Sequence, residues 1–232
     1  PVRSGKYALH LQHQYVSGST HNRCEIWPKI QLGKWTTKTG YVDWNQEYWL
    51  GFSVYLENWS NSLGNWNSIV QNHAVPNSWK WGVCDAGHNN WSISADNGFF
   101  AYNTFGRPCF NVIASLVNDP SMTPGIGAIG SRPYAIGISE MENRWIDIVI
   151  NWITSDGEDG KIKIWVDGEL VVELYGPNSH TNDTCGLPRE RCQSLTFGSY
   201  KSPKNTNLVS MYFDEIRIAD ERGSYDIVSP GQ

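Results

Sequence analysis

The sequence predicts an all-β fold, a sandwich or jelly roll of two packed antiparallel sheets. Three observations lead to it. Short β-rich segments separated by turn residues run along the whole chain, several of them alternate apolar and polar side chains, and no segment carries the apolar repeat of a three-turn amphipathic helix. About eleven strands without helices bury their apolar faces most simply by packing two sheets face to face.

The strands are expected where β-formers cluster between turn residues. In chain order they are 6–15, 21–29, 47–57, 67–75, 79–85, 90–96, 133–139, 144–153, 160–174, 194–200 and 207–220. With a side-chain period of two, the residues that share a core face are Leu50, Phe52, Val54 and Leu56 in one strand and Ile146, Ile148 and Ile150 in another. Asp167-Gly168 predicts a two-residue hairpin turn.

A single domain spanning residues 1–232 is expected, because no linker or internal repeat interrupts the strand pattern. The stretch from Phe99 to Arg132 is the exception. Its "NDPSMTPGIGAIGSRP" segment is rich in Gly, Pro and Ser and is too long for a hairpin turn. It is therefore a candidate functional loop or lid.

Composition narrows the class of ligand. The net charge of −5 argues against nucleic-acid binding, and no stretch has the roughly 20 apolar residues of a membrane span. The chain has 12 Trp and 11 Tyr, and aromatic rings suit strands but also stack on the apolar face of a sugar. Trp91 is one of the rings that we expect to contact a sugar.

The five cysteines and three sequons suggest a secreted protein, which we expect to be monomeric. Cys185 and Cys192 flank a Pro-containing loop and are a plausible disulfide, Cys84 with Cys109 is a weaker pair, and Cys24 would stay free. The chain opens at Pro1 without a signal peptide, as a mature or trimmed chain would.

Polar side chains alternate with core residues along several strands. They are His21, Arg23 and Glu25 in the first, Gln71 and His73 in the second, and Thr196 and Tyr200, followed by Lys201, in the third; Lys80 lies between two Trp. Each alone has a structural explanation, such as an Arg23–Glu25 salt bridge or a buried imidazole. Together they indicate a basic, amide-bearing face that binds a carbohydrate with carboxylates.

Such a face suits β-elimination from an O4-linked uronate. The reaction needs a group that neutralises the carboxylate, a base for the C5 proton and an acid for the O4 oxygen. Gln, Asn, His or Arg can neutralise, His, Tyr or Lys can act as the base, and Tyr can act as the acid. The polar rows contain every type.

At these residues the sequence resembles the jelly-roll polysaccharide lyases, which are related to glucuronan lyases and more distantly to heparin lyase I. "HNRCEI" resembles their R-x-E strand, and "IVQNHAVP" resembles the strand in which a Q-x-H segment lines the cleft. The later "RWIDIVINWITSDGEDGKIKIWVDGELVVEL" and "YFDEIRIAD" match the back half of the group, although that hairpin also occurs in other concanavalin A-like sandwiches. Asn72 departs from the pattern, where an aromatic residue is more usual.

The resemblance implies a lyase that cleaves a glucuronate-containing polysaccharide, glucuronan or ulvan, and leaves an unsaturated uronate end. The catalytic residues that it implies are Gln71 as neutraliser, His21 as base or carboxylate contact, and Tyr200 as acid and possible base. His73, which is of the same type and on a neighbouring row, is the alternative to His21. Arg23, Lys80, Lys201 and Trp91 would bind the substrate. Ulvan lyases of similar architecture use a Lys and a Tyr, which keeps Lys80 in consideration as the base.

The resemblance also implies one structural Ca²⁺, with Asp214 and backbone carbonyls near Gly5 as ligands, and no organic cofactor. A solvated Asp at a strand edge is the alternative for Asp214. A non-catalytic carbohydrate-binding module or lectin, and a lyase that acts on alginate, are the alternative functions. A glycosidase of the laminarinase type is disfavoured because no E-x-D-x-x-E run is present.

Overall fold

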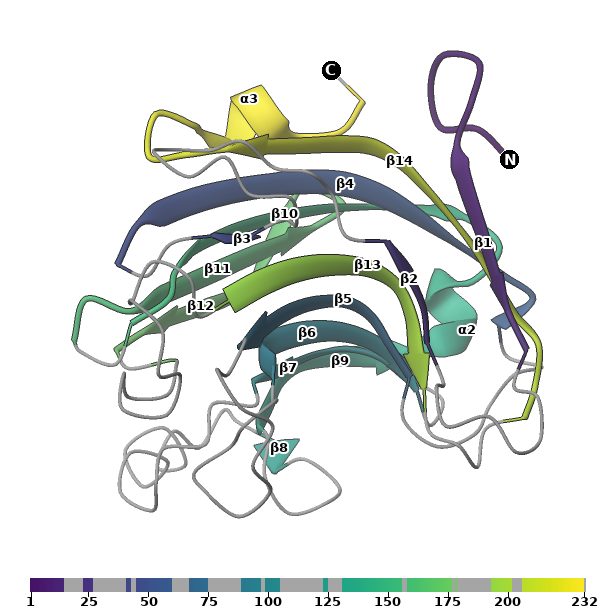
Figure 1. The fold of residues 1–232 in the computed structure, drawn as a ribbon, viewed down its shortest axis with the longest axis horizontal. Coiled ribbons are helices and arrows are strands. Elements are labelled where there is room, and N and C mark those ends of the chain that lie inside the picture. Colours follow the sequence, from purple (N-terminus) through teal and green to yellow (C-terminus); the bar gives the residue numbers. More distant parts are fainter. Residues whose placement is uncertain are drawn as a thin grey trace.

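A computed structural model of the chain describes residues 1–14, 23–26, 41–42, 45–59, 67–74, 89–96, 99–104, 123–124, 131–155, 158–176, 178, 193–201 and 206–231. These residues form two antiparallel sheets packed face to face (Figure 1). The prediction of an all-β sandwich is confirmed. No helix in this part of the chain is long and apolar enough to cross a membrane.

The first sheet has six strands. Their spatial order is β1 (Leu9–His13), β14 (Val209–Ala219), β4 (Glu47–Glu57), β10 (Trp145–Ile153), β11 (Lys161–Val166) and β12 (Glu169–Tyr175). The turn between β11 and β12 holds Asp167 and Gly168 at φ 51° and 87°, which are the positive angles that a type I′ hairpin needs. The predicted hairpin is therefore confirmed.

The second sheet has eight strands. Seven follow the order β2 (Arg23–Ile26), β13 (Gln193–Lys201), β5 (Asn67–Ala74), β6 (Asn89–Asp96), β7 (Phe99–Thr104), β9 (Ser131–Gly137) and β8 (Thr123–Pro124), and β3 (Tyr41–Val42) also pairs with β13. The expectation that Phe99 to Arg132 is a loop is wrong at its start, because Phe99–Thr104 pairs with both β6 and β9. It is also wrong at Thr123–Pro124, which pairs with Ser131 and Arg132 of β9. The expected strand 79–85 and the other four cysteines lie outside the described residues, whereas Cys24 is a free thiol.

The hydrophobic core lies between the two sheets. The seven residues predicted to face it from β4 and β10 are all fully buried, with 0% exposed surface: Leu50, Phe52, Val54, Leu56, Ile146, Ile148 and Ile150. Phe52 of the first sheet meets Phe197 of the second edge to face, with ring centroids 5.6 Å apart. Aromatic contacts of this kind stabilise a core beyond the area that they bury.

Two helices of four residues complete the described chain: α2 (Ile138–Met141) and α3 (Tyr225–Val228). The eight-stranded sheet curves beneath the six-stranded one, so that its outer face is concave (Figure 1). Along β2, β13 and β5, side chains alternate between the core and this concave face.

Candidate active site

Three neighbouring strands bring predicted site residues together. Strand β13 lies between β2 and β5, and its antiparallel register pairs Tyr200 with Arg23 and Thr196 with Gln71. Leu195 and Phe197 of β13 lie in the core. Because side chains alternate along a strand, Thr196 and Tyr200 face the opposite, concave side.

Glu25 of β2 contacts more of the polar groups on this face than its neighbours do, and we call it the hub of the site. Its Oε1 atom accepts hydrogen bonds from the Gln71 side-chain amide and from the Thr196 hydroxyl, the latter at 3.1 Å. Its Oε2 atom lies 3.6 Å from Arg23 Nη1, which is an ion-pair distance but too long for a hydrogen bond. One carboxylate thus connects groups from all three strands.

Arg23 and Tyr200 form the second contact of the site. The guanidinium carbon of Arg23 lies 3.9 Å from the centroid of the Tyr200 ring, which is a close cation–π arrangement. Arg23 is about one third exposed, with 34% of its side-chain surface accessible, whereas the Glu25 side chain has 3%. In the Arg23–Glu25 ion pair, the Arg23 side chain is therefore the one that solvent reaches more easily.

Burial and the polar neighbours of Glu25 act on the pKa of its carboxyl in opposite directions. Desolvation raises the pKa of this carboxyl above its ordinary value, while Arg23, Thr196 and Gln71 act in the opposite direction. Desolvation also raises the pKa of the neighbouring Cys24 thiol, with a smaller contribution from the Glu25 charge. The thiol is therefore a poor nucleophile.

Gly198 allows β2 to lie against β13 at this point. Its φ is +130°, and a Cβ atom added there would lie 2.1 Å from the carbonyl oxygen of Cys24 and 2.8 Å from the Cα of Glu25. A residue with a side chain would force the two strands apart. The close packing that places Glu25 beside Gln71 therefore depends on this glycine.

The structure describes only some of the predicted catalytic residues. Gln71 and Tyr200 lie on the concave face, although Gln71 has only 1% exposed surface. The backbone of His73 belongs to β5, but its side chain is not described. His21 and Lys80 lie outside the described residues, so their assignments stay predictions.

Two of the expected substrate-binding residues lie in the interior instead. Trp91 is 1% exposed and packs edge to face on Trp152 of the opposite sheet, at 5.4 Å between ring centroids. Lys201 is 0% exposed, and its Nζ donates to the carbonyl oxygens of His13 and Asn207. Both expectations are wrong for one reason: the strand period turns these side chains toward the core.

The interior position of Lys201 creates a buried polar cluster. His13 Nδ1 lies 3.0 Å from the Ser199 hydroxyl, which donates to Asn67 Oδ1 at 3.0 Å. Burial lowers the pKa of Lys201. Burial, and secondarily the Lys201 charge, lowers the pKa of His13 from its ordinary 6.5 to about 4.

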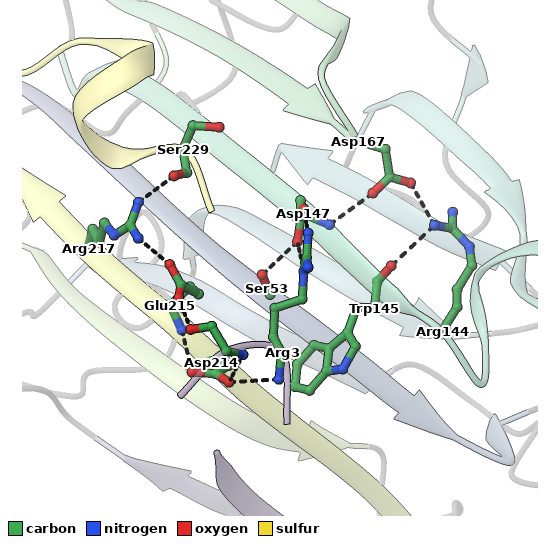
Figure 2. A network of polar contacts seen from close by, with 11 residues as sticks. Arg3, Ser53, Arg144, Trp145, Asp147, Asp167, Asp214, Glu215, Arg217 and Ser229 are labelled. Atoms are coloured by element: carbon green, nitrogen blue, oxygen red, sulfur yellow. Dashed lines mark hydrogen bonds and ion pairs between the residues drawn. The ribbon is translucent and has the colours of Figure 1, made fainter. Parts of the chain in front are cut away.

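Asp214 does not fit the calcium ligand that the sequence suggested. Its Oδ2 accepts hydrogen bonds from the backbone N–H groups of Arg3 and Ser4, at 2.8 and 3.1 Å, and its Oδ1 accepts from that of Glu215 at 2.8 Å (Figure 2). Calcium binds six to eight oxygen atoms. Both oxygens of Asp214 instead accept from N–H groups, and the hydrogens of these groups would point toward a cation bound there.

The part of the chain that the structure describes holds no group of three or more His, Cys, Asp or Glu that could bind a metal ion. Asp214 instead fastens the first residues of the chain to the outer face of the six-stranded sheet. The Arg3 side chain continues this network by pairing with Asp147 at 2.8 Å, and Asp147 accepts a hydrogen bond from Ser53 at 2.6 Å (Figure 2).

Glu25 and Thr196 are the members of the site that the sequence did not assign. The alternation in "HNRCEI" placed Glu25 on the same face as Arg23, but as a salt-bridge partner only. The signal for its larger role would have been the register between β2, β13 and β5. That register is set by long-range pairing, which a single sequence does not reveal.

A sequence model of the family described as "Polysaccharide lyase" matches residues 1–217. The chain belongs to this family. This polysaccharide lyase is accordingly an enzyme that acts on polysaccharides, as the resemblance in its sequence implied. A comparison with curated proteins finds no match.

Three solved structures with the same fold are lyases by name. The endo-β-1,4-glucuronan lyase of the fungus Trichoderma reesei is 16% identical with a TM-score of 0.67, and the match covers 99% of this chain and 86% of that one. Alginate lyase AlyC3 is 15% identical with a TM-score of 0.55, covering 92% and 75%. Alginate lyase Aly36B is 14% identical with a TM-score of 0.54, covering 91% and 80%. The jelly-roll architecture of the polysaccharide lyase agrees with these neighbours.

We expect Gly198→Ala to destabilise the enzyme by about 1–3 kcal/mol, because the new methyl group meets the Cys24 carbonyl and the backbone angle is strained. Urea unfolding measures the change. Gly137→Ala is the control, since Gly137 has φ −56° and its nearest neighbour would be the movable Glu140 side chain at 3.2 Å. Equal stability of the two variants would contradict the role given to Gly198.

We expect His13 to make the enzyme less stable as the pH falls from about 6.5 to 4. In this window the unfolded chain binds a proton at His13 and the folded chain does not, so the free energy of unfolding decreases by on the order of 1.4 kcal/mol per pH unit at most. Urea unfolding at several pH values would measure this slope. His13→Gln should have a shallower slope, and parallel curves for the two proteins would contradict the assignment.

Proposed function

We propose that this polysaccharide lyase cleaves a glucuronate-containing acidic polysaccharide, glucuronan or ulvan, by β-elimination. One observation carries the proposal. Arg23, Gln71 and Tyr200, which supply a cation, an amide and a phenol, come from three adjacent strands and share the concave face. These are group types that the elimination requires around a single sugar ring.

The reaction balances without water or a cofactor. A base removes the C5 proton, the electron pair of that bond forms the C4–C5 double bond, and the C4–O4 bond breaks as the oxygen receives a proton from an acid. Negative charge builds up on the adjacent carboxylate in the transition state. Donors aimed at this carboxylate lower the barrier, because they bind the transition state more tightly than the ground state.

Arg23 and Gln71 are assigned to the carboxylate in this scheme. The guanidinium of Arg23 is the accessible cation of the described site, and the amide of Gln71 has two N–H groups, of which one is bound to Glu25. Tyr200 is assigned as the acid. The base is assigned to His21, His73 or Lys80, or to Tyr200 in both roles.

Glucuronate is favoured over other uronates by the structural neighbours. The glucuronan lyase of Trichoderma reesei has a TM-score of 0.67, whereas alginate lyases AlyC3 and Aly36B have 0.55 and 0.54. Alginate is nevertheless the second candidate substrate, since several of the neighbours act on it by name. Secretion and a monomeric state stay predictions.

A panel of polymers tests the substrate. We expect a rise in ultraviolet absorbance with polyglucuronate or ulvan, because the new double bond is conjugated with the carboxylate, and a smaller rise or none with alginate. Reducing ends released without the chromophore would indicate hydrolysis and contradict β-elimination. A rise with alginate alone would replace glucuronate by the second candidate.

Tyr200→Phe tests the acid. We expect kcat to fall on the order of 10²-fold or more while KM changes little, since the variant loses only the proton-bearing oxygen and keeps the ring under Arg23. Initial rates on the best polymer of the panel give both constants. Tyr175→Phe is the control, because Tyr175 lies on β12 of the six-stranded sheet and is 59% exposed. Near wild-type kcat in Tyr200→Phe would exclude this tyrosine as the acid.

A further inference from the structure

The orientation of the Gln71 amide decides whether it can bind an anion. The two ends of a Gln side chain have nearly the same shape, but only the nitrogen end donates hydrogen bonds. The nitrogen of Gln71 faces the Glu25 carboxylate, which accepts hydrogen bonds and donates none when ionised. Turning the amide over would place two oxygens against each other, so Glu25 selects one of the two orientations.

The contact between Gln71 and Glu25 leaves one buried acceptor atom on each of the two side chains without a partner. Gln71 Oε1 and Glu25 Oε2 are both buried and have no hydrogen-bond partner among the described residues. Buried polar atoms are usually paired, and exceptions concentrate where a ligand or water completes the arrangement. Seven such atoms occur among the described residues, and two of them, both acceptors, lie on Gln71 and Glu25. A hydrogen-bond donor, such as a sugar hydroxyl or water, would complete these two.

The charge of Glu25 is balanced within the cluster. Arg23 on the same strand is the cation that faces it, and Tyr200 of β13 lies under that cation. Thr196 of β13 and Gln71 of β5 add neutral donors. Desolvation raises the pKa of Glu25, and the Arg23 charge and both hydrogen bonds oppose this shift.

We propose that Glu25 is a positioning residue, whose carboxylate holds the Gln71 amide with its nitrogen toward β2 so that the second N–H serves the substrate carboxylate. This inference rests on the proposed function, in which Gln71 neutralises a uronate. Glu25 acts through Gln71 and does not touch the reacting atoms. Thr196 shares the accepting oxygen and limits the rotation of the carboxylate.

The kinetic test is a double-mutant cycle of Glu25→Gln and Gln71→Ala. A Gln at position 25 has the same shape, but one of its two terminal groups is an NH₂ donor, so it can face either end of the Gln71 amide and no longer selects one orientation. We expect Glu25→Gln to lower kcat roughly tenfold or more, as the loss of a group that orients a ligand-binding side chain does. In the Gln71→Ala background the same change should lower kcat less than about threefold, because no amide is left to orient.

Glu47→Gln is the matched control. Glu47 lies on the other sheet, and its Oε1 also accepts from a side-chain amide, Asn151 at 2.8 Å, and from a cation, Lys161 at 2.7 Å. Its kcat should equal that of the wild type. If Glu25→Gln does not fold, Glu25→Asp replaces it and should lower kcat in the same Gln71-dependent way, since the charge stays but its reach is shorter by one methylene group.

A second readout does not need turnover. The ¹⁵N–¹H resonances of the Gln71 side-chain amide, assigned by their loss in Gln71→Ala, should show one proton protected from exchange by Glu25. Glu25→Gln should shift these resonances and remove the protection, and Glu47→Gln should leave them unchanged. If no polymer of the panel is cleaved, the proposed function fails while this measurement still tests the contact.

Three results would overturn the inference. They are unchanged amide resonances in Glu25→Gln, unchanged kcat in that variant despite a shifted amide, and an equal loss of kcat in both backgrounds of the cycle. The last result would mean that Glu25 serves the reaction independently of Gln71. A Gln71-dependent loss together with a shifted amide supports the positioning role.

Discussion

Strand β13 is held in register by its inner side chains, and the candidate site depends on that register. Phe197 packs edge to face against both Phe52 and Phe213 of the opposite sheet, with centroids 5.6 Å away in each pair. A slip of one residue would turn this ring outward and carry Thr196 and Tyr200 into the core. The aromatic contacts between the sheets therefore determine which polar groups the enzyme presents on its concave face.

The candidate site places a buried carboxyl, Glu25, beside an accessible cation, Arg23. The protein carries a net charge of −5, so attraction to the acidic polymer that we propose as substrate would have to come from local cations. Glu25 lies buried beside Arg23, whose cation offsets the charge of the carboxyl when that group is ionised. Its value lies in the order that it imposes: a buried carboxylate with two hydrogen-bond donors restricts side chains that would otherwise rotate.

Alternation within single strands made the core faces and the Asp167-Gly168 hairpin predictable, because both signals are local. It also placed Gln71 and Tyr200 among polar rows. The assignment of Lys201 to the substrate face is wrong, even though alternation places the residue after Tyr200 on the opposite, core side. Charged groups usually stay in contact with water, and this preference argued against a buried lysine. The hub at Glu25 and the N–H donors around Asp214 depend on strands far apart in sequence, which no local pattern encodes.

The contact between Trp91 and Trp152 also affects how the enzyme is observed. Both indoles lie in the core, one from each sheet, and are screened from solvent. Their fluorescence should be blue-shifted and should change when the sheets separate, while a sugar on the concave face would leave it almost unaltered. The contribution of this pair, which adds to the emission of the chain's ten other Trp residues, therefore reports on whether the two sheets stay packed and responds little to a bound carbohydrate.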